Sequence, residues 1–411
     1  MRNVKRVVSL SMLAMIGTAS ASQSLTTDWE SLIASRGPYV LQSALPPPSS
    51  QSRFGAATAL WHDKATGTQW AVVGAPDEDV FSGAVYVFSL TSGATDWRLD
   101  ARLTAPDADV LDKFGYAVAV DDDTIAIGAP GHIADFFVGA TYVFVRDPAT
   151  GSWKQQGDEL SATAGEFGWS LALRGDTLAV GDPECNCVQT YTRAAAVWSP
   201  QVKLSAPVEL MIPGFGMSLA MTDSYLLVGA LLDSAIATNQ GSAVLYARSH
   251  DGWNQQQILR PEIDTSAQQM FGFSVALSDD AIVVGAPMQK DQAGAAHTFT
   301  YDAAASRWTE QSLLRDTTGV TKPFFGQSLA LSDDVLAIGA PGADPSAAVY
   351  RLHGGAWTLD SVLTGDRGSG FGLSISAAGG QIIVGAPDSG DAMQGAAYVF
   401  ISDRIFADGV E

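Results

Sequence analysis

The 411 residues of this chain are too many for one ordinary globular domain, so they predict two or three domains or an array of repeats. Only 16% of the residues are charged and 41 are Gly, while Val, Ala, Tyr and Phe gather in short clusters. This composition favours a β-rich protein whose strands are covered on both faces. The formal net charge of −21 argues against nucleic acid or anionic lipid surfaces as partners, because both need a basic face.

The chain begins with the three parts of a secretory signal peptide, which we assign to residues 1–21. Basic side chains lie among the first six residues, residues 7–18 are mostly apolar, and Ala19-Ser20-Ala21 is a small-residue cleavage site. The apolar run is shorter than the ~20 residues of a membrane span, and no later segment is long and apolar enough to span a bilayer. We therefore expect cleavage and a secreted, periplasmic or cell-surface protein with no membrane span. Its mature net charge is 20 − 44 = −24, because three basic residues leave with the peptide.

After a lead-in at residues 22–38, the segment "YVLQSAL" at 39–45 places Tyr39 six residues before Leu45. A tryptophan and a leucine at the same interval recur farther along the chain, at Trp97/Leu103, Trp198/Leu204, Trp253/Leu259, Trp308/Leu314 and Trp357/Leu363, with Trp153/Leu160 one residue longer. We predict a β-strand at each copy.

A Phe-Gly pair opens each of seven repeats. The pairs start at Phe54, Phe114, Phe167, Phe215, Phe271, Phe325 and Phe371. Each is followed by Gly-Ala-Pro or a near copy, at Gly74, Gly128, Gly181, Gly229, Gly285, Gly339 and Gly385. A third motif precedes the next tryptophan. It is "GAVYVF" at residues 83–88, and the other repeats contain variants of it. Each period therefore holds four short β-type segments divided by turns.

The strand after each Phe-Gly pair is apolar on both faces, so both faces must be covered. Tight polar pairs such as Asp279-Asp280 or glycine pairs such as Gly379-Gly380 follow it and suit two-residue hairpin turns. Antiparallel four-stranded units repeated in this way predict an all-β, seven-bladed β-propeller over residues 39–401, with blades starting near 54, 114, 167, 215, 271, 325 and 371. The last blade ends without a Trp–Leu segment, so we expect residues 39–45 to supply its outer strand and close the ring.

Cys185 and Cys187 are the only cysteines, with one residue between them. In an oxidising compartment the expected state is a local disulfide. The ring would be small and strained, which leaves a free pair as an alternative. A metal site is the third alternative, but it would need at least two more ligands, and no other His or Cys lies nearby in the sequence.

The order and spacing of the motifs over residues 39–401 resemble the FG-GAP repeats of integrin α-subunit propellers and of bacterial secreted proteins. Integrin-type blades often carry an Asp-rich calcium loop between Phe-Gly and Gly-Ala-Pro. Here six of the seven intervals hold only a tight turn, and the longer first interval holds a single acid, Asp63. We therefore expect no calcium of the integrin type, no other metal and no cofactor.

Two features could suggest catalysis. A Gly-x-Ser phrase resembles a nucleophile elbow, but it occurs five times, as Gly-x-Ser-x-Ala at Ser170, Ser218, Ser274 and Ser328 and as Gly-x-Ser-x-Ser at Ser374. Ala57 and Ala117 hold the same position in the first two repeats. Five copies favour small-residue packing over a nucleophile. An enzyme would need unlike groups such as His132, an acid and a Tyr brought together in a pocket. We therefore predict no catalytic residues, with a polysaccharide-acting propeller enzyme as the alternative.

The connections after Gly-Ala-Pro and between blades emerge on one face of a propeller, which in the integrin relatives binds ligands. We predict a binding site there, formed by Asp77, Glu78, Asp79, Phe81, Asp109, Asp112, Asp135, Phe136, Phe137, Asp291, Asp388 and Asp391. The resulting hypothesis is a secreted, monomeric, non-catalytic binding or adhesion protein that recognises a protein or glycan. A structural cell-surface component is a further alternative, as are loops with no partner. The tail at 402–411 has no role in a blade and looks like a short terminal sorting tag.

Overall fold

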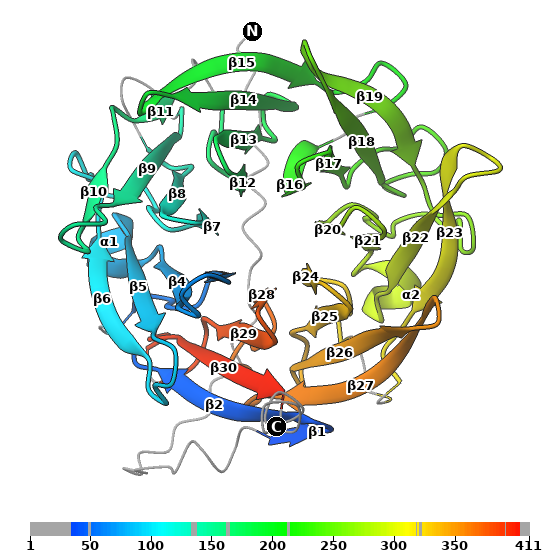
Figure 1. Ribbon diagram of the computed structural model, residues 1–411. Coiled ribbons are helices and arrows are strands. Elements are labelled where there is room, and N and C mark those ends of the chain that lie inside the picture. The colour runs from blue at the N-terminus through cyan, green and yellow to red at the C-terminus, as the bar shows by residue number, and fades with distance from the viewer. Residues whose placement is uncertain are drawn as a thin grey trace, which may run out of the picture.

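The protein forms seven β-sheets arranged around a central axis (Figure 1). The computed structural model describes residues 34–47, 51–132, 138–161, 165–211, 214–317, 319, 323–390 and 392–402. The predicted signal peptide, most of the lead-in and residues 403–411 of the tail lie outside the described residues. The predicted all-β, seven-bladed propeller is confirmed.

The strands follow the four-segment pattern of the sequence. Blade 1 contains β3 (Ala57–His62), β4 (Gln69–Ala75), β5 (Ala84–Leu90) and β6 (Arg98–Leu103). Blade 2 contains β7 (Ala117–Asp121), β8 (Thr124–Ala129) and β9 (Ala140–Arg146), with its outer edge split into β10 (Trp153–Gln155) and β11 (Leu160–Ser161). Blade 3 contains β12 (Ser170–Arg174), β13 (Thr177–Asp182), β14 (Cys187–Ala194) and β15 (Val197–Ser205). Blade 4 contains β16 (Phe215–Met221), β17 (Tyr225–Ala230), β18 (Ser242–Ser249) and β19 (Gly252–Leu259).

The remaining blades complete the ring. Blade 5 contains β20 (Ser274–Leu277), β21 (Ile282–Gly285), β22 (Ala296–Asp302) and β23 (Arg307–Leu314). Blade 6 contains β24 (Leu329–Ser332), β25 (Val335–Ala340), β26 (Ser346–His353) and β27 (Ala356–Thr364). Blade 7 contains β28 (Ser374–Ala378), β29 (Gln381–Ala386), β30 (Ala396–Ser402) and, outermost, β2 (Tyr39–Leu45). Two one-turn elements, α1 (Glu78–Phe81) and α2 (Gln289–Gln292), lie in loops, and no helix in the described part of the chain has the length and apolar character to cross a membrane.

The N-terminal segment lies along the two last blades. β2 pairs antiparallel with β30, with Tyr39 opposite Ser402 and Leu45 opposite Ala397. Just before it, β1 (Ala34–Arg36) pairs with β27 as a fifth strand of blade 6. The sequence contained no signal for β1. The N-terminal segment therefore joins blade 6 to blade 7 as well as completing blade 7 (Figure 1).

The Phe-Gly pairs explain why the motif recurs, because each one joins two blades. The seven Phe side chains are all buried between sheets. The backbone of Phe114, which opens blade 2, forms a parallel bridge with Gly83 of blade 1, and its N–H donates to the carbonyl of Ser82 (3.0 Å). Equivalent bridges recur at Phe54, Phe167, Phe271 and Phe325. All seven rings are thus packing anchors, and at these five the backbone is also paired with the preceding blade.

The Gly of each Gly-Ala-Pro motif provides the space for that junction. A Cβ on Gly285 would lie within 3.0 Å of the carbonyl oxygen of Gly326, the Phe-Gly glycine of the next blade. The hydroxyl of Ser274 donates to that same carbonyl (2.7 Å). The other repeated serines make the same bond, at Ser170, Ser218, Ser328 and Ser374. The serines therefore pack as small residues, as predicted, and their hydroxyls also form hydrogen bonds between neighbouring blades.

Candidate functional site

The predicted site lies on the face formed by the connections between second and third strands and between blades, called here the loop-rich face. At the junction of blades 1 and 2, α1 is a left-handed turn, because Asp79, Val80 and Phe81 have φ of 50°, 61° and 66°. A left-handed residue costs about 1–2 kcal/mol, and a β-branched residue such as Val80 adopts this conformation rarely. Strain of this kind clusters at functional sites. The turn projects Val80 outward with 67% of its surface exposed.

A partly buried ionic network holds this strained turn. The Tyr86 hydroxyl donates to the Glu78 carboxylate (2.8 Å), and Arg102 donates to Glu78 Oε1 (2.7 Å) and Asp79 Oδ2 (2.7 Å). Burial raises the pKa of the Tyr86 hydroxyl, and its bond to Glu78 raises that pKa further. Glu78 is buried and its carboxylate binds Tyr86 and Arg102, so it supports the turn from inside, and its predicted contact with a ligand stays a prediction.

A second buried cluster lies at the start of blade 2. Asp112 is fully buried, with the Asp109 amide donating to Oδ2 (2.7 Å) and His132 Nδ1 3.2 Å from the same oxygen. The Tyr142 hydroxyl donates to Asp107 (2.9 Å), and its ring meets the His132 ring edge-on at 6.1 Å between centroids. A His, acids and a Tyr therefore converge as the enzyme alternative requires.

These convergent groups sit in the packed interior and not at a cavity. Asp112 and Tyr142 have no exposed surface, His132 has almost none, and neither cavity described below is lined by them. Asp112 stabilises the loop between blades 1 and 2 from inside, and its predicted contact with a ligand stays a prediction.

Exposed apolar side chains gather on the loop-rich face. Beside Val80 and Phe81, the loop between blades 1 and 2 exposes Val110 and Leu111. The Lys113 amide donates to the Phe81 carbonyl (2.8 Å) and so ties the two loops together. A second group around blades 3 to 5 comprises Val208, Met211, Ile236 and Ile263, of which Val208 is 97% exposed. Of these residues, Val80, Phe81, Val110 and Leu111 lie in two loops that this backbone bond joins.

The other predicted site residues divide into three sets. Asp77 and Asp388 both lie near Arg53, which pairs with Asp388 (3.2 Å). Burial raises the pKa of Asp77, and the charge of Arg53 opposes that rise. Asp291 lies in α2 of blade 5, across the ring from α1 (Figure 1). Asp135, Phe136, Phe137 and Asp391 lie outside the described residues.

Cys185 and Cys187 are joined by a disulfide, with Cα atoms 5.3 Å apart. Among the described residues, Asp182 and these two cysteines are the one group of three side chains close enough to share a metal ion. Bonded sulfurs are not thiolates, however, so they do not bind a metal. The Asp182 carboxylate instead accepts the amide N–H groups of Glu166 (3.0 Å) and Cys185 (3.1 Å).

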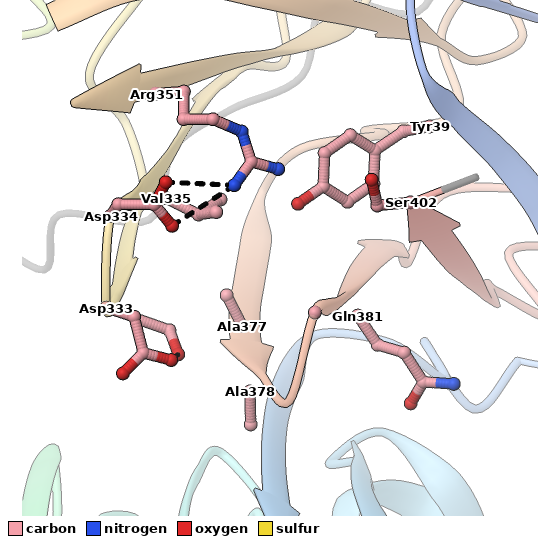
Figure 2. Close-up of a pocket in the computed structure, with 11 residues that line it drawn as sticks. Tyr39, Asp333, Asp334, Val335, Arg351, Ala377, Ala378, Gln381 and Ser402 are labelled. Carbon is pink, nitrogen blue, oxygen red and sulfur yellow. Dashed lines mark hydrogen bonds and ion pairs between the residues drawn. The ribbon is translucent and has the colours of Figure 1, made fainter. Parts of the chain in front are cut away.

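Both cavities described in the structure open on the opposite face, formed by the turns between first and second strands and called here the hairpin-turn face. The cavity in Figure 2 lies between blades 6 and 7 and measures about 240 Å³. It is lined by Tyr39, Ser332, Asp333, Asp334, Val335, Arg351, Ala377, Ala378, Gly380, Gln381 and Ser402. The other is an open hollow in blade 4 around Asp223 and Arg248. Sequence reasoning missed both, although small residues at aligned repeat positions of blade 7 were a usable signal.

Three segments of the chain, residues 97–144, 253–299 and 308–352, match the FG-GAP repeat family. Each begins at an outer-strand tryptophan and ends in the third strand of the following blade, so the repeat is offset from the blade by one strand. No curated protein matches the chain.

Solved structures share the fold. One is a protein from Bacteroides uniformis provisionally named 6-phosphogluconolactonase, 10% identical, with a TM-score of 0.53, covering 73% of this chain and 83% of its own. A protein of the same provisional name from Bacteroides fragilis is 12% identical, with a TM-score of 0.53 and coverage of 77% and 85%. A protein from Lactobacillus plantarum is 13% identical, with a TM-score of 0.57 and coverage of 78% and 90%. At these identities the likeness extends to the fold alone.

Proposed function

We propose that this seven-bladed FG-GAP β-propeller is an exported, non-catalytic binding protein that recognises another protein through its loop-rich face. The observation that carries the proposal is the strained α1 turn, which holds Val80 and Phe81 in solvent beside Val110 and Leu111. Exposed apolar groups that project from a rigid support serve as the buried centre of a protein interface. No metal or cofactor is needed for this role.

The surroundings of the apolar groups favour a partner with basic as well as apolar character. Asp79 and Asp109 lie next to the exposed side chains, and the chain as a whole is acidic. Opposite charge at the rim of an interface speeds association and selects partners. A glycan would instead need exposed polar groups converging on a hollow, so a protein partner fits this face better.

The enzyme alternative has less support. The His132, Asp112 and Tyr142 cluster is closed to a substrate, and the provisional names of the structural neighbours describe those proteins at 10–12% identity. Fold likeness at that level carries no activity to this chain.

The test is a binding screen of residues 22–411 against cell-surface and extracellular proteins, run beside a glycan array. The variant Val80→Asp with Phe81→Gln places on α1 the residues that α2 carries at the same positions, Asp291 and Gln292, which adopt the same left-handed turn. The fold should therefore be kept, and we expect protein binding to weaken at least tenfold.

A matched control is Leu99→Gln, which removes an exposed apolar side chain from the outer strand β6 and should leave binding unchanged. Binding that is unaffected by the α1 variant, or a screen that returns glycans and no protein, would contradict the proposal.

A further inference from the structure

Blade 7 departs from the other six blades at the positions that line the cavity of Figure 2. Ala377 of β28 pairs with Ile382, three residues before the Gly of Gly-Ala-Pro. In the same register the other blades carry larger aliphatic side chains, namely Leu60, Val120, Leu173, Met221, Leu277 and Leu331. The cavity therefore exists because blade 7 has a methyl group where every other blade fills the space.

One residue pair between the two outer strands of blade 7 also has smaller side chains than its counterparts. In blades 2 to 6 a tryptophan lies opposite a long side chain, as in Trp153/Arg146, Trp198/Arg193, Trp253/Arg248, Trp308/Tyr301 and Trp357/Leu352. In blade 7 the pair is Tyr39 and Ser402. The adjacent turn is Gly379-Gly380, with no side chains where blade 6 has Asp333 and Asp334. Four of these positions, Ala377, Tyr39, Ser402 and Gly380, line the cavity.

The reduced positions leave polar groups without partners. Tyr39 and Ser402 are more than nine-tenths buried and line the cavity. Neither Tyr39 Oη nor Ser402 Oγ has a partner at ordinary hydrogen-bond geometry, although the Arg351 guanidinium lies close enough to the Tyr39 hydroxyl to oppose the rise that burial causes in its pKa. Figure 2 shows the Tyr39 hydroxyl directed at the space beside Arg351. An unpaired buried hydroxyl costs about 1–3 kcal/mol, so both groups favour an occupant that can bond to them. Burial raises the pKa of Tyr39, which keeps its hydroxyl available as a donor.

The charges around the cavity indicate what kind of molecule it accepts. Arg351 makes two bonds to Asp334 (3.1 and 3.0 Å), so its charge is already balanced. Asp333 adds a further negative charge at the mouth, which disfavours phosphates and carboxylates. The walls offer both donors and acceptors, while Ala377, Ala378 and Val335 supply an apolar surface. A neutral ring with hydroxyl groups on its edge and C–H groups on its face matches this combination.

We propose that the cavity between blades 6 and 7 is a binding site for one neutral sugar ring, separate from the loop-rich face. Its volume of about 240 Å³ corresponds to roughly eight water molecules at ~30 Å³ each, which suits a monosaccharide or a terminal glycan residue and not a longer chain. Tyr39, Ser402 and Arg351 bond to its hydroxyl groups, and Ala377 leaves the room for its ring.

The test is saturation-transfer NMR and calorimetry on residues 22–411 with glucose, galactose, mannose, fucose and N-acetylglucosamine, each also as its methyl glycoside. The key variant is Ala377→Leu, which gives blade 7 the residue found at this position in four other blades, so it should fold. We expect at least one sugar to bind saturably, Ala377→Leu to weaken it at least tenfold, and Tyr39→Phe to weaken it several-fold. Binding of the glycoside as well as the free sugar would identify a terminal glycan residue as the ligand, and binding of the free sugar alone would identify a monosaccharide.

The matched control is Val120→Leu at the same position of blade 2, which should leave sugar binding unchanged. Putrescine serves as a cationic probe. Absence of binding by every sugar, equal binding by Ala377→Leu and the unchanged protein, or binding of putrescine alone would overturn the proposal. These results are independent of the α1 variant, so this site and the loop-rich face can fail separately.

Discussion

The substitution Gly285→Ala tests whether the close approach of blades holds the ring together. Gly285 has an ordinary φ, so an added methyl group strains no backbone angle there. Its Cβ would lie within 3.0 Å of two atoms, the carbonyl oxygen of Gly326 in the next blade and Ser274 Oγ. The blades must therefore move apart, and the hydrogen bond from Ser274 to Gly326 (2.7 Å) is lost.

The magnitude follows from these two effects. Overpacking a tight contact costs about 1–3 kcal/mol. A lost hydrogen bond costs about 0.5–1.5 kcal/mol. We expect Gly285→Ala to lower the free energy of unfolding by about 2–4 kcal/mol, measured by urea denaturation with tryptophan fluorescence. Ser274→Ala should cost only about 1 kcal/mol, because Ala57 and Ala117 hold the same position in blades 1 and 2.

The double variant separates the two contacts. Ser274→Ala removes the hydroxyl that a new methyl group would strike, but the carbonyl of Gly326 stays in place. We therefore expect Ser274→Ala with Gly285→Ala to remain less stable than Ser274→Ala alone by at least 1 kcal/mol. If Gly285→Ala costs no more than Ser274→Ala, the blades do not touch as described and the reasoning fails.

Three further predictions concern the interior. Phe271→Ala should lower the free energy of unfolding by about 3–5 kcal/mol, because its ring is fully buried between blades 4 and 5. Burial pushes the pKa of Glu310 upward, but the bond and charge of His297 and the amides of Glu262 and Ile263 outweigh it, so the pKa lies below the ordinary 4.5. The stability that ionised Glu310 contributes is therefore present above pH 4.5 and lost as pH falls through the lowered pKa. In Glu310→Gln the free energy of unfolding should change less with pH over that range, as measured by acid denaturation. Burial raises the pKa of Tyr191 from 10.0 to about 12, so its contribution to stability should be full below pH 10 and disappear as pH rises to about 12. Tyr191→Phe should remove this loss in alkaline denaturation, and an unchanged curve would contradict it.

The spacing of Phe-Gly, Gly-Ala-Pro and Trp–Leu motifs was enough to predict seven four-stranded blades. Each motif is short and favours one arrangement. A large apolar Phe must be buried against a neighbouring sheet, and a glycine, which has no side chain, lets the carbonyl of the next blade approach closely. Tyr39 and Leu45 could be assigned to an outer strand by the same logic, because their interval equals that of the tryptophan and leucine pairs.

The site residues were harder to predict, because whether an acidic side chain is exposed depends on hydrogen-bond and ion-pair partners that are distant in the sequence. The sequence suggests that Glu78 and Asp112 are exposed loop acids. In the structure Arg102 and Tyr86, on neighbouring strands, and His132, in the loop after β8, contact these acids in the interior. The left-handed path of α1 also has no sequence signal, since Val80 is among the residues least suited to it.

The number and order of the blades follow from repeated local motifs whose apolar residues must bury one another, so both could be predicted from the sequence. Which polar groups face solvent, and where space remains, depends on contacts between distant parts of the folded chain. Tyr39 and Ser402 lie at opposite ends of the chain, and the gap beside Ala377 forms only when the ring brings them together. A void is a property of what surrounds it, so it appears only when all its walls are in place.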